Sequence, residues 1–413
     1  MVRLRKNLLL FTVICCWGIS LRSMVFDNRY FPLFPHTFSR TPAKKTYASA
    51  DAFFMLAHNA TDEEDITFGI PEIWGQYDLI KLANAFVLLG NANPLAPNFD
   101  QFSSIIYKMS GAIDSQGIEW AYEHRFTKHF SIGFNAFFMH LFSRINFHLD
   151  DQLIRQYGLS EDQILQLDQI RRQLQNSLGL QPTKSSTVGF SDIDLYFRFG
   201  KIWEYFLKFK RIDLGIRGGM MINTGLKRDV NNPASLPYGG NGFFGLYLAG
   251  DAEFELKEDW KAGLYVRMSK RFARTFPNRI PIANEQPLFG AVLGDLRVDP
   301  GLTFAISPYA RVEDIRDGLG GQLQYTAVVH YDDLYVDKRE NPVPSATLQA
   351  LNDRSDFGSE YFTVNLFYDF SRVRKPHWCA PIVQLQWDMP VSVLAAKRVS
   401  KTQRFSLGLL LSF

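Results

Sequence analysis

The chain ends in Arg404-Phe405-Ser406-Leu407-Gly408-Leu409-Leu410-Leu411-Ser412-Phe413, and this stretch decides the fold. Every second residue from Phe405 to Phe413 is apolar, whereas the residues between them are mostly small or polar. Successive side chains of a β-strand point to opposite faces. The segment therefore predicts a strand with one wholly apolar face, which must be covered by a protein core or by lipid.

The same alternation runs through the chain from Ser103 onward. It is clearest in four segments, 118–123, 246–254, 260–269 and 383–389. A soluble sandwich also alternates, but its polar face usually carries Lys, Thr and Glu rather than the mixture of Gly, Tyr, Asp and Arg found here. The pattern therefore favours strands that face lipid on one side and water on the other, as in a transmembrane antiparallel up-and-down β-barrel.

The connections between these segments fall into two length classes that alternate along the chain. Membrane barrels have short turns at one rim and long loops at the other. The short connections lie near 127–128, 200–209, 257–259, 313–318 and 371–378, and the long polar ones at 148–186, 223–242, 273–300, 336–356 and 390–403.

Counting strands backward from the C-terminus gives about twelve, beginning near Ser104–Met109. If Tyr47–Leu56 joins the wall together with one more strand, the count becomes fourteen, because single-chain bacterial barrels have even strand numbers. We therefore expect an all-β barrel over residues 103–413.

The N-terminus has the pattern of a secretory signal peptide over residues 1–20. A basic start with Arg3, Arg5 and Lys6 precedes the apolar run Leu8–Trp17, and Gly18-Ile19-Ser20 offers a cleavage site. Two of the three cysteines lie within this segment, so Cys379 is alone in the mature chain. An internal disulfide and a cysteine zinc site are thereby excluded.

Composition agrees with a membrane barrel and argues against a nucleic-acid partner. Aromatic residues make up 15% of the chain and charged residues 21%. Barrels expose many aromatic side chains to lipid and to the membrane interface. The net charge is only +3 and no basic tail or stripe stands out, whereas nucleic-acid binding needs a basic footprint.

The terminal ten residues resemble the C-terminal assembly signal of Gram-negative outer-membrane proteins. That signal has a terminal aromatic residue preceded by apolar residues at alternate positions. The resemblance implies a porin-like or transporter-like barrel in the outer membrane, with membrane lipid and the barrel assembly machinery as partners, and it identifies no functional subfamily. The residues that match the signal are Phe405, Leu407, Leu409, Leu411 and Phe413.

Residues 21–102 are expected to form a leader and a hatch or periplasmic cap. Leu21–Thr46 is irregular and interrupted by prolines, so it is interpreted as a flexible leader, whereas Tyr77–Leu89 has helical periodicity. The helix is placed either in the barrel lumen or as a periplasmic cap. A second helix is predicted in the longest outer loop, from the Ser160/Gln163 capping box to Gly179.

Parity along the strands predicts which side chains line the lumen. Charged groups of both signs share this face, where they can orient polar solutes and screen ions, or simply cross-link the interior. The lumen-lining candidates are Glu119, Glu123, Asp192, Asp194, Arg198, Arg217, Asp251, Glu253, Arg267, Arg311, Gln324 and Gln386.

These features predict an outer-membrane channel or transporter for small solutes that needs no cofactor, no metal and no catalytic residue. One alternative is a barrel hydrolase, in which His330 and Asp332 would act with an inward serine such as Ser269 or Ser307. The other is a surface interaction or adhesion protein that works through its long loops.

Overall fold

The computed structural model describes residues 28–34, 36–257, 259–340, 342, 345–373 and 380–413. The predicted signal peptide and Cys379 lie outside these residues.

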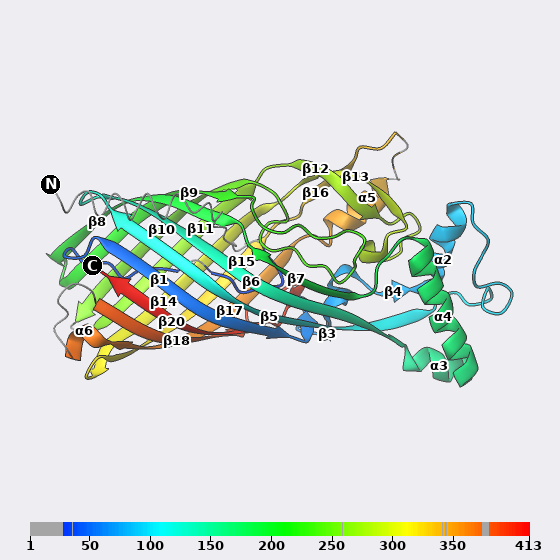
Figure 1. The fold of residues 1–413 in the computed structure, drawn as a ribbon, viewed down its shortest axis with the longest axis horizontal. Helices are drawn as coiled ribbons and strands as arrows, with labels where there is room; N and C mark the ends of the chain where they lie inside the picture. The colour runs from blue at the N-terminus through cyan, green and yellow to red at the C-terminus, as the bar shows by residue number, and fades with distance from the viewer. Residues whose placement is uncertain (1–27, 35, 258, 341, 343–344, 374–379) are drawn as a thin grey trace.

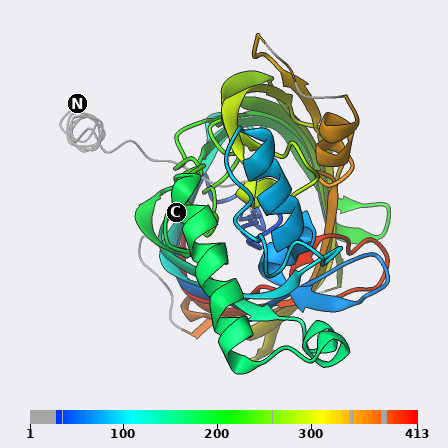
Figure 2. The ribbon, with the colours of Figure 1, turned by 90° about the vertical axis from the view of Figure 1, so that its right-hand side faces the viewer.

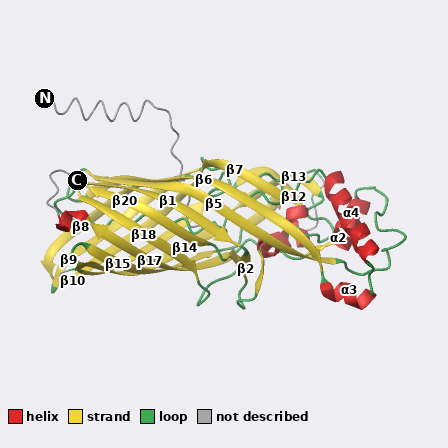
Figure 3. Cartoon of the chain, turned by 60° about the horizontal axis from the view of Figure 1, so that its bottom comes forward, coloured by secondary structure: helices red, strands yellow, loops and turns green. Residues whose placement is uncertain are grey.

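Twelve antiparallel strands close into a barrel in the described part of the chain (Figure 1; Figure 3). The barrel closes at β1, which pairs with β20 on one side and with β5 on the other. Every backbone amide in the wall can then bond to a neighbouring strand, as a lipid environment requires. The wall strands are β1 (Thr46–Ala57), β5 (Ile106–Arg125), β6 (Phe130–Leu149), β8 (Ile193–Phe206), β9 (Phe209–Ile222), β10 (Gly245–Lys257), β11 (Trp260–Arg271), β14 (Leu302–Arg316), β15 (Leu319–His330), β17 (Phe357–Asp369), β18 (Ala380–Pro390) and β20 (Gln403–Ser412).

The predicted strand number is correct, but the predicted start of the wall at residue 103 is wrong. Thr46–Ala57 is a full wall strand, paired with ten residues of β20 and twelve of β5. Most of the segment Ser104–Met109, counted as a separate strand, is the beginning of the long strand β5, which starts at Ile106. The twelve-strand count therefore left out β1, which was considered only for a fourteen-strand wall, and it divided β5 in two, since the polar and glycine residues within β5 resemble a turn.

The two rims of the barrel differ as the connection lengths predict. Two-residue turns join β8 to β9 at Leu207-Lys208 and β14 to β15 at Asp317-Gly318, all four residues having positive φ. Hairpins favour such turns because their twist matches that of the strands. The chain ends at this rim, where the backbone N–H of Thr46 donates to the carbonyl of Phe413. Every long connection lies at the opposite rim, at the right of Figure 1.

The outer face of the wall is apolar. In β20, Leu407 is 60% exposed and Leu409 is 42% exposed, whereas Arg404 and Ser406 are buried on the inner face. Phe405 stacks between Phe54 of β1 and Trp387 of β18, with ring centroids 5.0 and 5.2 Å apart. The five residues that resemble the assembly signal thus lie on the outward face of the closing strand. No helix in the described residues is both long and apolar enough to cross a membrane.

The long connections build a cap over one mouth of the barrel (Figure 2). Leu167 and Leu174 of α4 pack with Tyr77 and Leu82 of the α2 region in one buried cluster. The predicted helix at Tyr77–Leu89 therefore lies in this cap, at the rim opposite the two-residue turns and not in the lumen, because it belongs to the long connection from β1 to β5. The elements outside the wall are β2 (Asn59–Thr61), β3 (Thr67–Gly69), η1 (Ile70–Trp74), β4 (Tyr77–Asp78), α2 (Leu79–Leu88), α3 (Asp151–Tyr157), α4 (Glu161–Ser177), β7 (Lys184–Phe190), β12 (Arg274–Ile280), η2 (Pro287–Phe289), β13 (Val292–Asp299), β16 (Leu334–Asp337), α5 (Ser345–Asn352), α6 (Phe370–Val373) and β19 (Val399–Ser400).

Candidate functional site

The described part of the segment before β1, residues 28–34 and 36–45, lies inside the barrel (Figure 1), and we call this segment the plug. At the capped end, the side chain of Asn28 donates to the carbonyls of Pro237 and Gly239 in the β9–β10 connection. At the other end, the backbone N–H of Lys45 donates to the carbonyl of Phe413. The segment interpreted as a flexible leader therefore runs along the lumen from the cap to the turn rim.

The plug packs against the inner wall through both apolar and polar contacts. Tyr30, Phe31 and Leu33 are buried in a cluster with Phe53 of β1 and Phe137 of β6. The carbonyl of Tyr30 accepts hydrogen bonds from the Ser400 and Thr402 hydroxyls at 2.9 and 2.6 Å, and Arg404 donates to the carbonyl of Pro32 at 3.3 Å. These contacts satisfy backbone carbonyls that have no strand partner, which a buried irregular segment requires.

Arg40 is the electrostatic centre of the plug. Its Nε and one terminal nitrogen both lie 2.6 Å from the Glu123 carboxylate, and its other terminal nitrogen lies 3.3 Å from Asp251 and 3.5 Å from Asp213. Only 4% of the Arg40 side chain is exposed. A planar guanidinium that meets a carboxylate through two bonds makes a strong, oriented contact. Arg40 therefore joins the plug to three wall strands.

The predicted lumen-lining residues lie inside the barrel and its cap in four groups. Glu123, Arg198, Arg217 and Asp251 surround Arg40, and Asp251 accepts from both wall arginines at 2.7–3.0 Å. Asp194 pairs with Arg267, and Asp192 with Arg271, each at 2.7 Å. Glu119 pairs with Arg404. Glu253 accepts from Ser39 of the plug at 2.7 Å and from Arg211 at 3.0 Å, while Arg311, Gln324 and Gln386 border a cavity.

Two cavities are lined by residues of the plug. One, of about 190 Å³, is under the cap and is bordered by Asn28, Arg29 and Tyr30 at the start of the described plug. The other, of about 330 Å³, opens beside Phe34, His36 and Ser39 and has a more polar lining, with Lys261 and Arg311 among its side chains. We call the space under the cap the outer chamber and the other the inner chamber, and residues of the plug line both.

Around His330, the described residues do not form the catalytic triad that the hydrolase alternative requires. Nδ1 of His330 lies 2.7 Å from the Thr303 hydroxyl, and Nε2 lies 3.0 Å from Asp333 rather than from Asp332. Both ring nitrogens are therefore occupied without a serine. The hydroxyl of Ser307 bonds to Thr326 at 3.0 Å instead.

The sequence alone predicted neither the plug nor the arginines that border the outer chamber. Arg40 and Arg228 lie in segments without strand periodicity, and Arg279 lies in the stretch 273–300 that was predicted to be a long connection, so strand parity was not applied to them. The available signal was indirect: Pro32, Pro35 and Pro42 punctuate the leader, and proline is excluded from central strand positions.

No protein-family model matches the chain, and no curated protein matches it. Among solved structures, the chain is similar to the COG4313 outer membrane channel from Pseudomonas putida F1, with 10% identity, a TM-score of 0.50, and coverage of 92% of this chain and 99% of that one. The fold is that of a Gram-negative outer-membrane β-barrel. A Pseudomonas aeruginosa FadL homologue is also similar, with 7% identity, a TM-score of 0.33, and coverage of 89% and 90%. At sequence identities this low, the similarity indicates a shared fold and nothing about function.

Proposed function

We propose that this protein is an outer-membrane channel for small solutes, closed at rest by residues 28–45. The observation behind the proposal is the plug inside the barrel, whose residues line both chambers. Each chamber has room for a small molecule and is bordered by polar or charged side chains. In pores of this kind, width and lining charges set selectivity.

The contacts of the plug are numerous but noncovalent, which suits a closure that can move. Removing Arg40 would leave the buried carboxylate of Glu123 without its two-bond partner. Loss of one member of a buried ion pair costs about 3–5 kcal/mol. That penalty falls on the closed arrangement, so weakening Arg40 should favour opening.

The orientation in the membrane follows from the two rims. In outer-membrane barrels the short turns face the periplasm and the long loops face the outside. We therefore place the cap outside the cell, the chain end at Phe413 in the periplasm, and the outward-facing Phe405 series in contact with lipid. The same strand is proposed to be the segment that the barrel assembly machinery recognises.

Ion conductance of the purified protein in a planar bilayer tests the proposal. The variants are a chain lacking residues 28–40 and Arg40→Ala, with Arg316→Ala as the matched control because the Arg316 side chain is 87% exposed at a turn. A deletion must stop before Thr46, since β1 belongs to the wall. We expect little current from the wild type and the control, steady current from the deletion, and frequent openings from Arg40→Ala.

Two results would contradict the proposal. A deletion variant that is silent, although circular dichroism shows a folded barrel, would remove the channel function and favour a surface interaction role for the long loops. A wild-type current equal to that of the deletion would refute closure by the plug.

A further inference from the structure

The outer chamber has an excess of positive charge. Arg29, Arg228 and Arg279 all border it, and none of the three forms an ion pair with any described residue. Arg279 donates to the carbonyl of Leu178 at 2.9 Å and to the side-chain oxygen of Asn231 at 2.7 Å.

The other two arginines are also held without a carboxylate. Arg29 donates to the carbonyls of Arg354 and Ser355. Nε of Arg228 is buried without a hydrogen-bond partner among the described residues. A fourth arginine, Arg271, is neutralised by Asp192.

Acidic groups offset this excess only in part: the charge of Asp333 acts on Arg29, and that of Asp229 on Arg228 and Arg279. Asp333 accepts from the backbone N–H of Gly301 at 2.9 Å and contacts His330 at 3.0 Å. Burial lowers the pKa of Arg228 and of Arg279, and for Arg279 the nearby charge of Arg228 lowers it further. Burying a cation without a directly paired opposite charge costs several kcal/mol, so this part of the lining favours an anion.

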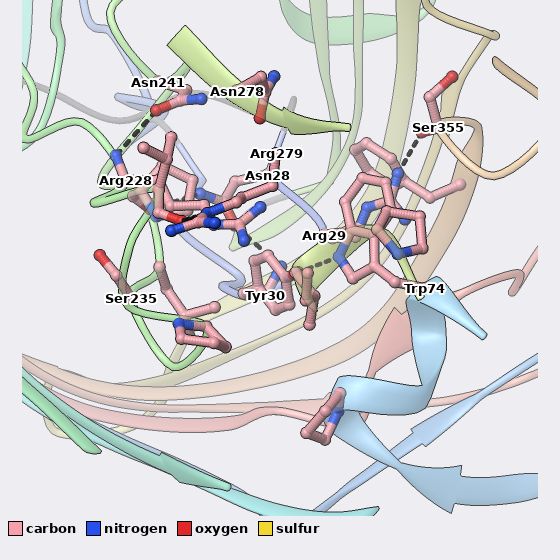
Figure 4. Close-up of a pocket in the computed structure, with 18 of the residues that line it drawn as sticks. Asn28, Arg29, Tyr30, Trp74, Arg228, Ser235, Asn241, Asn278, Arg279 and Ser355 are labelled. Atoms are coloured by element: carbon pink, nitrogen blue, oxygen red, sulfur yellow. Dashed lines mark hydrogen bonds between the residues drawn. The ribbon is translucent and has the colours of Figure 1, made fainter. Parts of the chain in front are cut away.

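Much of the remaining lining is apolar and partly aromatic, although asparagine and serine side chains also border the chamber. Trp74, Phe243 and Phe276 contribute rings, and Leu296 and Val298 contribute aliphatic surface. Figure 4 shows Arg228 and Arg279 together on one side of the chamber and Arg29 with Trp74 across from them. An apolar cavity of about 150 Å³ is large enough for benzene. The chamber, at about 190 Å³, has room for one aromatic ring and a short polar arm.

We propose that the outer chamber binds a small aromatic carboxylate, with the carboxylate between Arg228 and Arg279 and the ring against the apolar side chains. This inference names the ligand class for the channel function proposed above. Guanidinium groups suit the task because their planar donors match a carboxylate. The bound anion would also offset the uncompensated charge.

Isothermal titration calorimetry on the full chain in detergent tests the inference with phenylacetate and with its neutral isostere phenylacetamide. We expect phenylacetate to bind at least about tenfold more tightly, since hydrogen bonds to charged groups are stronger than neutral ones. Arg228→Gln should remove most of this preference, and Arg228→Lys should retain part of it. The control is Arg172→Gln, because the Arg172 side chain is 69% exposed on α4 and does not border the chamber.

Equal affinity for acid and amide in the wild type would overturn the inference without any variant. So would an unchanged preference in Arg228→Gln, or no binding of phenylacetate at all. The binding and conductance experiments can be told apart. A silent plug deletion would contradict the channel function without affecting the calorimetry, and a lack of phenylacetate binding would contradict the ligand class without affecting the conductance.

Discussion

At the scale of single residues, Asp192 holds the cap to the wall. It is fully buried, pairs with Arg271 at 2.7 Å, and accepts from the backbone N–H groups of Gly225 and Gly240 at 3.0 and 2.8 Å. Asp192→Ala would remove the carboxylate that pairs with the buried guanidinium of Arg271 and that accepts from both backbone N–H groups. We therefore expect a loss of about 3–5 kcal/mol in the free energy of unfolding. Urea titration in detergent measures it.

Lys108→Ala is the control for this residue. Lys108 is 64% exposed and pairs with Asp150 at 3.0 Å, and an exposed pair contributes only about 0–1 kcal/mol. Equal losses in the two variants would mean that the Asp192 contacts do not stabilise the fold. Strand parity predicted that Asp192 points inward, but its partners come from β11 and from the β9–β10 connection, and local periodicity contains no information on either.

At the scale of elements, α4 is attached to the cap by one apolar stripe. Leu167 is fully buried against the α2 region, whereas Leu165 on the same helix is 62% exposed. Leu167→Ala should destabilise the cap by about 2–5 kcal/mol through lost burial and an unfilled cavity. Hydrogen exchange should then accelerate in α2 and α4 but not in the wall strands. Unchanged exchange in α2, or equal acceleration in Leu165→Ala, would contradict this coupling.

The same helix shows what local sequence signals can establish. The predicted capping box of Ser160 and Gln163 is confirmed, and Gly179 follows the helix with a positive φ. These signals act over a few residues, so the sequence contains them in full. The position of α2 depends on contacts with residues almost a hundred positions away, including the bond from Gln175 to the Tyr77 hydroxyl. For that reason its periodicity predicted a helix but not its location.

At the scale of the whole molecule, the wall was predictable because every strand repeats the same two-residue period against the same two environments. The plug was not, because its fit is decided by groups scattered over the wall. Arg40, for example, meets Glu123 of β5, Asp213 of β9 and Asp251 of β10. Because the plug has no strand or helix periodicity, the sequence alone predicts only an irregular leader, and its position becomes clear only from its contacts with the folded barrel.

The orientation of the wall toward lipid gives a last prediction. Leu407 of β20 and Leu334 of β16 are similarly exposed, at 60% and 55%, but only Leu407 lies on the barrel wall. Leu407→Arg should cost about 2–4 kcal/mol if that position faces the middle of the bilayer, whereas Leu334→Arg, in the outer cap, should change stability by less than about 0.5 kcal/mol. Folding titrations into phospholipid vesicles compare the two variants directly. In a barrel surrounded by water, both arginines would be tolerated equally, so an equal and small effect would show that the apolar face does not meet lipid.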